Sequence, residues 1–126
     1  MNLPAKPPRR RNETRDLTHP IRSALNRLPG VQVWRNNTGC VDLATGGKIV
    51  YGLGSGSADL VGLVASHGLR LGRFFALEVK WPGKRPTKEQ LAWSNVVRGM
   101  GGFAAVVTSV DEAIAAVERA MSGDIQ

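Results

Sequence analysis

The segment from Phe74 to Lys80 alternates in a way that fits a β-strand and little else. Side chains of a strand point to opposite faces with a period of two. The apolar side chains that share one face are Phe75, Leu77 and Val79. Glu78 and Lys80 then lie side by side on the other face. The segment therefore predicts a buried strand that carries an anion and a cation at its C-terminal end.

Other elements surround this strand in the sequence. Apolar patterns predict strands over 31–35, from about 40, and over 49–51, 59–64 and 103–107. Helices are predicted after three residues that can cap a helix, Thr18, Thr87 and Ser109. Gln90 and Glu112 complete capping boxes with Thr87 and Ser109. The apolar side of the second helix is predicted to contain Leu91, Trp93, Val97 and Met100. A glycine-rich loop over 52–57 and a turn over 66–72 complete the pattern.

This order of elements predicts an α/β protein with a mixed central sheet flanked by helices. The strands over 74–80 and 103–107 are joined through a helix, so we expect them to be parallel. The length of 126 residues fits one domain, which we place at 17–122. Residues 1–16 are basic and rich in proline, and we expect them to form a disordered N-terminal segment.

The formal charge of +7 favours a polyanionic partner, of which nucleic acid is the commonest. The N-terminal segment, with Lys6 among its cations, can reach a phosphate backbone or can merely keep the chain soluble. No run approaches the roughly 18 apolar residues of a membrane span, and no signal peptide is recognisable. We therefore expect a cytoplasmic protein without a membrane partner.

A second carboxylate changes the interpretation of Glu78 and Lys80. By themselves, these two residues can be an ion pair at the rim of a sheet, which is common and contributes little. Asp59, however, opens an apolar strand just after the glycine-rich loop. If the two strands are neighbours, Asp59 and Glu78 converge, and two close carboxylates repel unless a cation lies between them. Mg²⁺ suits such a site, because it needs only one or two carboxylates and keeps several waters.

The sequence at this point resembles a known family. Residues 56–60 (GSADL) followed by 77–80 (LEVK) resemble the PD-(D/E)XK nuclease superfamily. The closer similarity is to the VRR-NUC domain, the virus-type replication-repair nuclease. Further similar segments are 35–39 (RNNTG), the basic loop before Gln90, and 102–109 (GFAAVVTS). The resemblance covers about residues 17–120, which is nearly the whole folded part.

The resemblance implies a restriction-endonuclease-like αβββαβ core. It implies Asp59 and Glu78 as ligands of Mg²⁺ or Mn²⁺, helped by the carbonyl of Val79. Lys80 would be the catalytic lysine. Gln90 would lie near the site, although a capping box explains it equally well. Many members of the family carry a glutamate on the first helix. The matching residues 17–21 contain none, and the nearest acids are Glu13 and Asp16.

Candidate phosphate-binding residues flank these motifs. They are Arg35, Asn36, Asn37, Ser57, Lys84, Arg85 and Lys88. The cations can bind phosphates or can be solvated, and the asparagines can simply form a turn.

These residues together predict a divalent-metal-dependent endonuclease that hydrolyses DNA in a bacterial or phage-infected cell. We expect a homodimer, since a two-fold pair of sites suits junctions or flaps, such as a Holliday junction in DNA repair. The alternatives are a non-catalytic nucleic-acid-binding module and a structural or assembly protein.

Overall fold

The main elements of the computed structural model lie close to where the sequence patterns predict them. The structure describes residues 3–5, 9–65 and 71–126. The strands are β1 (Val31–Arg35), β2 (Gly39–Asp42), β3 (Lys48–Tyr51), β4 (Leu60–Ala65), β5 (Gly72–Val79) and β6 (Phe103–Val107). The helices are η1 (Thr14–Thr18), α1 (His19–Leu25), α2 (Lys88–Gly99) and α3 (Val110–Met121). Lys6 of the predicted N-terminal segment and most of the predicted turn over 66–72 lie outside the described residues.

The described residues form one four-stranded sheet with the order β1-β4-β5-β6. β4 pairs antiparallel with β1 and with β5, whereas β5 and β6 are parallel. The predicted mixed sheet flanked by helices is therefore confirmed, as is the parallel pair joined through α2. The finer prediction, a restriction-endonuclease-like core, stays a prediction. No helix within residues 3–5, 9–65 and 71–126 has the length and apolar character needed to cross a membrane.

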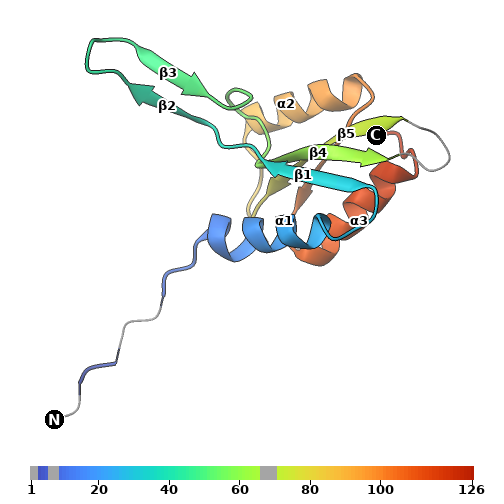
Figure 1. The fold of residues 1–126 in the computed structure, drawn as a ribbon, viewed down its shortest axis with the longest axis horizontal. Coiled ribbons are helices and arrows are strands. Elements are labelled where there is room, and N and C mark those ends of the chain that lie inside the picture. The colour runs from blue at the N-terminus through green and yellow to red at the C-terminus, as the bar shows by residue number, and fades with distance from the viewer. Residues whose placement is uncertain (1–2, 6–8, 66–70) are drawn as a thin grey trace.

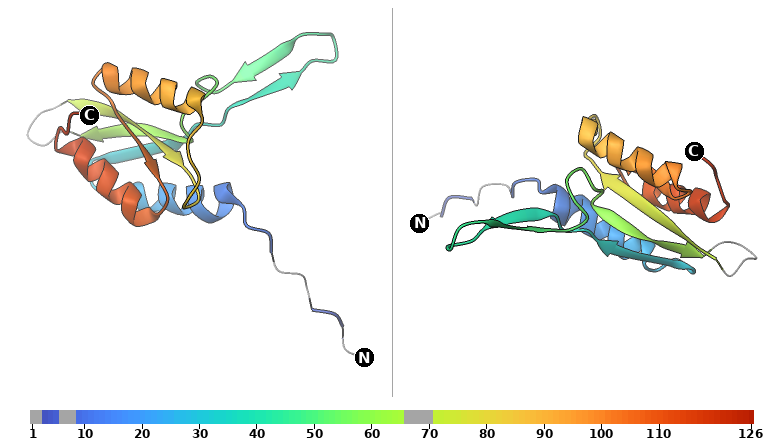
Figure 2. Two further views of the ribbon diagram at one scale, coloured as in Figure 1. Left: turned by 180° about the vertical axis from the view of Figure 1, so that it is seen from behind. Right: turned by 90° about the horizontal axis from the view of Figure 1, so that it is seen from above.

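Helices lie on both faces of the sheet, with α1 and α3 on one face and α2 on the other (Figures 1 and 2). The larger cluster of buried side chains lies under α1 and α3. Its largest members are Phe75, Phe103, Ile21, Leu25, Leu60 and Leu77. The layer under α2 is built from small side chains, namely Ala58, Ala76 and Ala104. The faces of the sheet thus differ, and the α2 face has room for polar side chains at its edge.

The strands β2 and β3 are not part of this sheet. Within the described part of the chain, they pair only with each other, as a second, two-stranded sheet. This hairpin stands away from the body of the molecule (Figures 1 and 2). The sequence patterns located both strands but gave no sign that they leave the main sheet.

The first helical segment begins earlier than predicted. Thr18 was expected to be its N-cap, but its backbone is helical and its side chain is buried. Helical turns begin at Thr14, and the wide π turn η1 leads directly into α1. Leu17 lies within this turn and is buried in the core, so the turn packs as part of the folded body. Pro20 cannot donate a helical hydrogen bond, and it follows just after this irregular turn.

The capping predictions hold in full for α2 and in part for α3. Thr87 and Gln90 exchange both capping-box hydrogen bonds. The Ser109 side chain accepts from the N–H of Glu112, whose own carboxylate instead accepts from Thr108. The prediction that Leu91 and Met100 lie on the apolar, packed side of α2 is wrong. They are exposed because α2 covers only part of the sheet, and Trp93 and Val97 make the contact.

Close packing at the centre of the sheet leaves no room for a side chain at one position. Gly62 lies in β4, and a Cβ there would collide with the Gln32 carbonyl oxygen and the Phe75 ring. We expect Gly62→Ala to reduce the free energy of unfolding by about 3 kcal/mol or more, since overpacking a buried strand is costly. Urea denaturation of purified protein would measure this. Gly72→Ala is the matched control, since a Cβ at Gly72 meets only ordinary van der Waals contact. Equal stability of the two variants would contradict the prediction.

Candidate active site

The beginning of β4 and the end of β5 meet at one corner of the sheet. Leu60 pairs with Leu77, and one further step in this register places Asp59 opposite Glu78. Leu60 and Leu77 belong to the core under α1 and α3. Because side chains alternate, Asp59 and Glu78 both lie on the α2 face. The structure therefore brings together the two carboxylates that the sequence predicts to converge.

Asp59 is held firmly at this corner. Its Oδ2 atom accepts a hydrogen bond of 2.8 Å from the backbone N–H of Val79. Its backbone carbonyl accepts another of 2.8 Å from the N–H of Asn36. The carboxylate thus continues the β4–β5 ladder and is fixed on the strand that carries Glu78. Such preorganisation suits a metal ligand or a catalytic group.

Glu78 is a buried acid, with only 5% of its surface exposed. The pKa of Glu78 is raised to about 8, first by burial and then by the charge of Asp59 and a hydrogen bond with Asp59. Lys80 acts in the opposite direction, because its ammonium lies 3.9 Å from the Glu78 Oε1 atom. Without a bound cation, Glu78 therefore keeps its proton at neutral pH and shares it with Asp59.

Gln90 serves both of the roles that the sequence left open. Its Oε1 atom accepts from the N–H of Thr87 at 2.8 Å, as the capping box requires. Its Nε2 atom donates to Glu78 Oε1 at 2.9 Å. The first turn of α2 is thereby tied directly to the buried acid. The helix cap and the site are one hydrogen-bonded unit.

Glu13 is a third acid near the site, and sequence patterns did not assign it. Its Oε2 atom accepts a hydrogen bond of 3.1 Å from the N–H of Trp81, just beyond Lys80. Its charge also contributes to the raised pKa of Glu78. The other nearby acid, Asp16, is instead paired with Arg15 at 2.8 Å. The π turn after Glu13 shifts the helical register, which is why spacing alone could not select it.

The predicted phosphate-binding residues Asn36 and Ser57 are engaged inside the protein. The Asn36 amide donates to Ser57 Oγ at 2.8 Å and to the Ala58 carbonyl at 2.9 Å. Ser57 Oγ donates to the Gly54 carbonyl at 2.6 Å. Gly56 has a φ of 80° and lies against the backbone of Glu89 on α2, where a Cβ would collide. These contacts hold the loop that presents Asp59, and a contact of Asn36 or Ser57 with nucleic acid stays a prediction.

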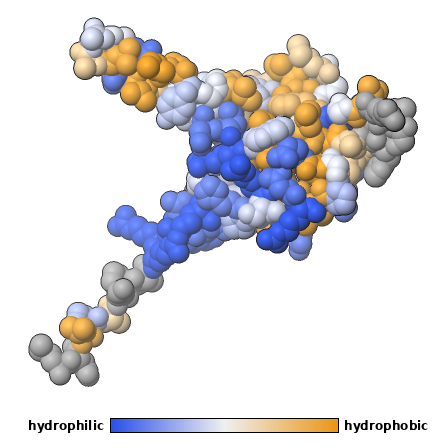
Figure 3. Space-filling model, in the orientation of Figure 1, coloured by the Kyte–Doolittle hydropathy of each residue, from blue (hydrophilic) through white to orange (hydrophobic). Residues whose placement is uncertain are grey.

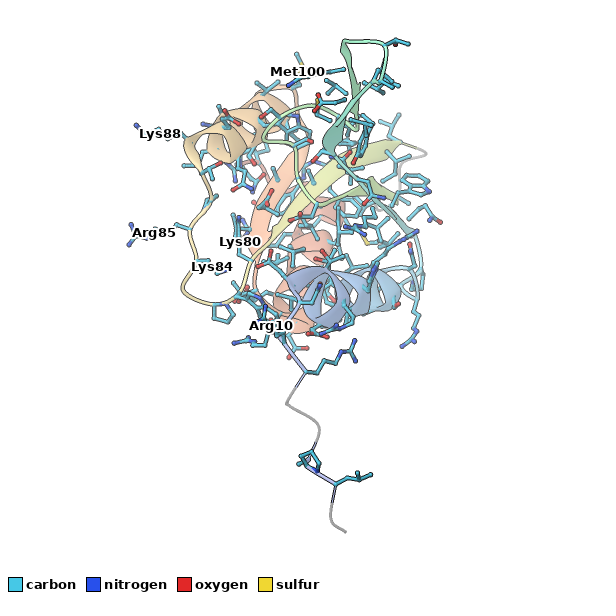
Figure 4. All side chains as sticks on the ribbon, turned by 90° about the vertical axis from the view of Figure 1, so that its left-hand side faces the viewer. Arg10, Lys80, Lys84, Arg85, Lys88 and Met100 are labelled. Atoms are coloured by element: carbon cyan, nitrogen blue, oxygen red, sulfur yellow. The ribbon has the colours of Figure 1, made fainter. Side chains whose placement is uncertain are left out.

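The remaining predicted phosphate-binding residues are exposed. Arg35 and Asn37 lie at the end of β1, where Arg35 pairs with Leu60 beside Asp59. Lys84, Arg85 and Lys88 lie on the loop between β5 and α2 and at the start of α2. The side of the molecule between the hairpin and the N-terminal segment is hydrophilic in Figure 3. In Figure 4 this side faces the viewer, and Arg85 and Lys88 point away from the body at the left edge of the view, farther out than Lys80.

Trp81 links the N-terminal segment to this side of the molecule. The guanidinium of Arg11 lies 3.8 Å from the centre of the Trp81 ring. The ring also packs against the core, so it has a structural role. Residues 11–13 are therefore in contact with the chain immediately after Lys80.

The donors at the corner fit a hard divalent cation. Among the described residues, no three His, Cys, Asp or Glu side chains are grouped as a ready-made metal site. Mg²⁺ needs only one or two carboxylates and retains water, so Asp59 and Glu78 satisfy its usual requirement. After burial, the charge of Asp59 is the next cause of the raised pKa of Glu78, because the two acids repel as anions. A cation in place of the shared proton would relieve this repulsion.

The chain matches no protein-family model and no curated protein sequence. The similarity to VRR-NUC domains therefore stays a prediction from short motifs. The proposed function therefore rests on the geometry of the corner.

The raised pKa of Glu78 makes stability depend on pH. Between about pH 4.5 and about pH 8, the unfolded chain releases a proton that the folded chain keeps on Glu78. The free energy of unfolding therefore falls as the pH rises through this window. Glu78→Gln has no such proton and retains an oxygen that accepts from Gln90. In EDTA, we expect its melting temperature to exceed that of the wild type by several degrees at pH 8 and by little at pH 5.

Thermal unfolding of both proteins in EDTA across this pH range would measure the effect. Parallel pH profiles of the wild type and Glu78→Gln would contradict it. Addition of Mg²⁺ at pH 8 should stabilise the wild type more than the variant, since a cation that binds only the folded chain stabilises it.

Proposed function

We propose that this chain is a divalent-metal-dependent endonuclease that hydrolyses DNA phosphodiester bonds. The observation that carries the proposal is the convergence of Asp59, buried Glu78 and Lys80 at one corner of the sheet. A surface ion pair would need neither the second carboxylate nor the burial of Glu78. A purely nucleic-acid-binding surface would not gain from two carboxylates, which repel phosphate unless a cation intervenes.

Asp59 and Glu78 would hold Mg²⁺ or Mn²⁺, with the carbonyl of Val79 as a further oxygen donor. The cation, when bound, supplies polarisation of the phosphate and acidification of a coordinated water. Lys80 would orient the attacking water or stabilise negative charge on the phosphate. Its ammonium is already held at the site, 3.9 Å from Glu78 Oε1. Gln90 would fix the rotamer of Glu78 through its hydrogen bond.

The surface around this corner supports a nucleic acid as substrate. Lys84, Arg85 and Lys88 lie exposed beside the site, and the whole chain carries a formal charge of +7. Each phosphate contact would contribute to a salt-dependent affinity. We further propose a restriction-endonuclease-like core, a homodimer and a branched DNA substrate such as a junction or flap. The cytoplasm of a bacterial or phage-infected cell is where such a substrate would occur.

A substrate panel tests the proposal. Labelled linear, flapped and four-way-junction DNA, with matched RNA, would be incubated with the wild type in Mg²⁺, Mn²⁺ or EDTA. We expect metal-dependent cutting of DNA, with the branched forms cut faster than linear duplex. Metal-independent binding without cutting of any substrate would instead favour the binding module. Absence of affinity for all of them at low salt would favour a structural protein.

A further inference from the structure

The hairpin of β2 and β3 has two chemically different faces. We call residues Gly39–Tyr51 the arm. Direct pairing places Val41 opposite Ile49, on the same face as Tyr51. The other face is mixed, because it carries the pair Cys40 and Val50 beside the charged pair Asp42 and Lys48. An antiparallel ribbon with one apolar face and one more polar face normally packs its apolar face against a core.

The apolar face of the arm is uncovered within one chain. The exposed fractions are 50% for Val41, 51% for Ile49 and 45% for Tyr51. Neither hydrophobic cluster of the described residues includes a side chain from the arm. The arm also stands clear of the body, and its surface is largely hydrophobic in Figure 3. An isolated two-stranded hairpin is marginally stable at best in water, so this arm needs a partner surface.

The main sheet carries a matching uncovered surface. On its α2 face, α2 contacts mainly β5 and β6, and Val61 of β4 packs into the layer beneath it. The large hydrophobic side chains exposed there are Trp34 on β1, Leu63 on β4 and Phe74 on β5, at 47%, 46% and 37%. Leu63 and Phe74 are direct cross-strand partners. We call Trp34, Leu63 and Phe74 the open face. It continues into a groove of about 280 Å³ lined by Phe74, Trp93, Val96, Val97, Met100 and Gly102.

Charge favours a second copy of the chain as the occupant of these surfaces. The arm contains one cation, Lys48, and one anion, Asp42, whose charged groups lie 3.8 Å apart. It is therefore neutral in a chain of formal charge +7, and it offers little to a phosphate backbone. Two such chains repel each other in general, so an interface between them must be built from uncharged surface. The apolar face of the arm and the open face both meet this requirement.

We propose that the arm of one copy packs its apolar face onto the open face of a second copy. Each chain carries both surfaces, and in this proposal the exchange is reciprocal, which closes the assembly as a two-fold dimer. The inference rests on the homodimer of the proposed function and specifies its interface. It does not depend on the chemistry at Asp59 and Glu78. Cleavage assays test the proposed chemistry and mass measurements test the proposed interface, so either proposal can fail without the other.

Sedimentation equilibrium of the purified full chain tests this interface. We expect the wild type to have twice the 13.5 kDa mass of one chain. Ile49→Asp places a carboxylate on the apolar face, and we expect the dimer dissociation constant to rise about 100-fold or more. Val50→Asp is the matched control, since Val50 is the next residue, is 70% exposed and points to the opposite face. The Val50→Asp variant should remain dimeric. Circular dichroism and thermal unfolding would establish that every variant is folded.

A charge exchange tests the contact between the two surfaces. Leu63→Lys alone should weaken the dimer, as Ile49→Asp does. The variant that combines Ile49→Asp with Leu63→Lys should recover at least about tenfold of the lost affinity, because each new carboxylate then faces an ammonium of the partner. A monomeric wild type, a dimer unaffected by Ile49→Asp, or a double variant no better than its parents would overturn the proposal. A monomer that loses DNA affinity through Ile49→Asp would identify nucleic acid as the occupant instead.

Discussion

Replacing Lys80 with alanine is expected to lower the rate of metal-dependent DNA cleavage by about 10²- to 10⁴-fold. The Lys80 ammonium lies 3.9 Å from Glu78 Oε1, and its side chain is only 17% exposed. No other cation has this position beside the two carboxylates among the described residues. Its loss would remove the group that orients water or stabilises charge on the phosphate. Single-turnover cleavage in saturating Mg²⁺ measures the effect on the chemical step.

Lysine removal also lowers the net charge, so a matched control is needed. Lys48→Ala makes the same change at an exposed position on the arm, where the pairing with Asp42 is worth little. We expect Lys48→Ala to cut at the wild-type rate. DNA affinity in EDTA should be nearly the same for Lys80→Ala and Lys48→Ala. A Lys80→Ala protein that cuts within a factor of about three of the wild type would exclude a catalytic role for Lys80.

The second large effect is expected at Asp59, where two substitutions separate chemistry from folding. Asp59→Asn keeps an oxygen that can accept from the Val79 N–H, which now donates to Asp59 Oδ2 at 2.8 Å. It removes the negative charge that a cation requires. It also removes one cause of the raised pKa of Glu78. We expect a folded protein, at least as stable as the wild type in EDTA near pH 8, with cleavage reduced about 10³-fold or more.

Asp59→Ala should lose activity to the same extent and should also be less stable. It leaves the buried Val79 N–H without its acceptor, which costs about 1–3 kcal/mol. Urea denaturation in EDTA compares the two variants, and single-turnover cleavage compares both with the wild type. Wild-type cleavage by Asp59→Asn would contradict the assignment of Asp59 as a metal ligand. Equal instability of both variants would contradict the structural role of its hydrogen bond.

The sequence predicted the central strands and the corner of the sheet because both follow from local rules. Period-two alternation assigned Glu78 and Lys80 to one face, and antiparallel pairing with β4 then brings in Asp59. The capping box of α2 is likewise local, and it correctly located Gln90 at the start of the helix. The direct bond from Gln90 to Glu78 required the packing of α2 on the sheet, which no spacing rule contains.

Features that depend on tertiary packing escaped the sequence patterns. Glu13 reaches Trp81 because a π turn, rather than a regular helical turn, follows it. Leu91 and Met100 have helical spacing with Trp93, but α2 covers too little of the sheet to bury them. The arm has ordinary strand alternation, and only its position away from the body reveals that its apolar face is uncovered.

We propose that the corner formed by Asp59, Glu78 and Lys80 hydrolyses DNA with the help of a divalent cation. The most direct test is a Mg²⁺ titration of wild-type protein first dialysed against EDTA, using the fastest-cut DNA of the panel, with Asp59→Asn beside it. We expect no cleavage in EDTA, saturable recovery for the wild type and no recovery for the variant at any Mg²⁺ concentration. Undiminished cleavage in EDTA, or equal recovery of both proteins, would contradict it.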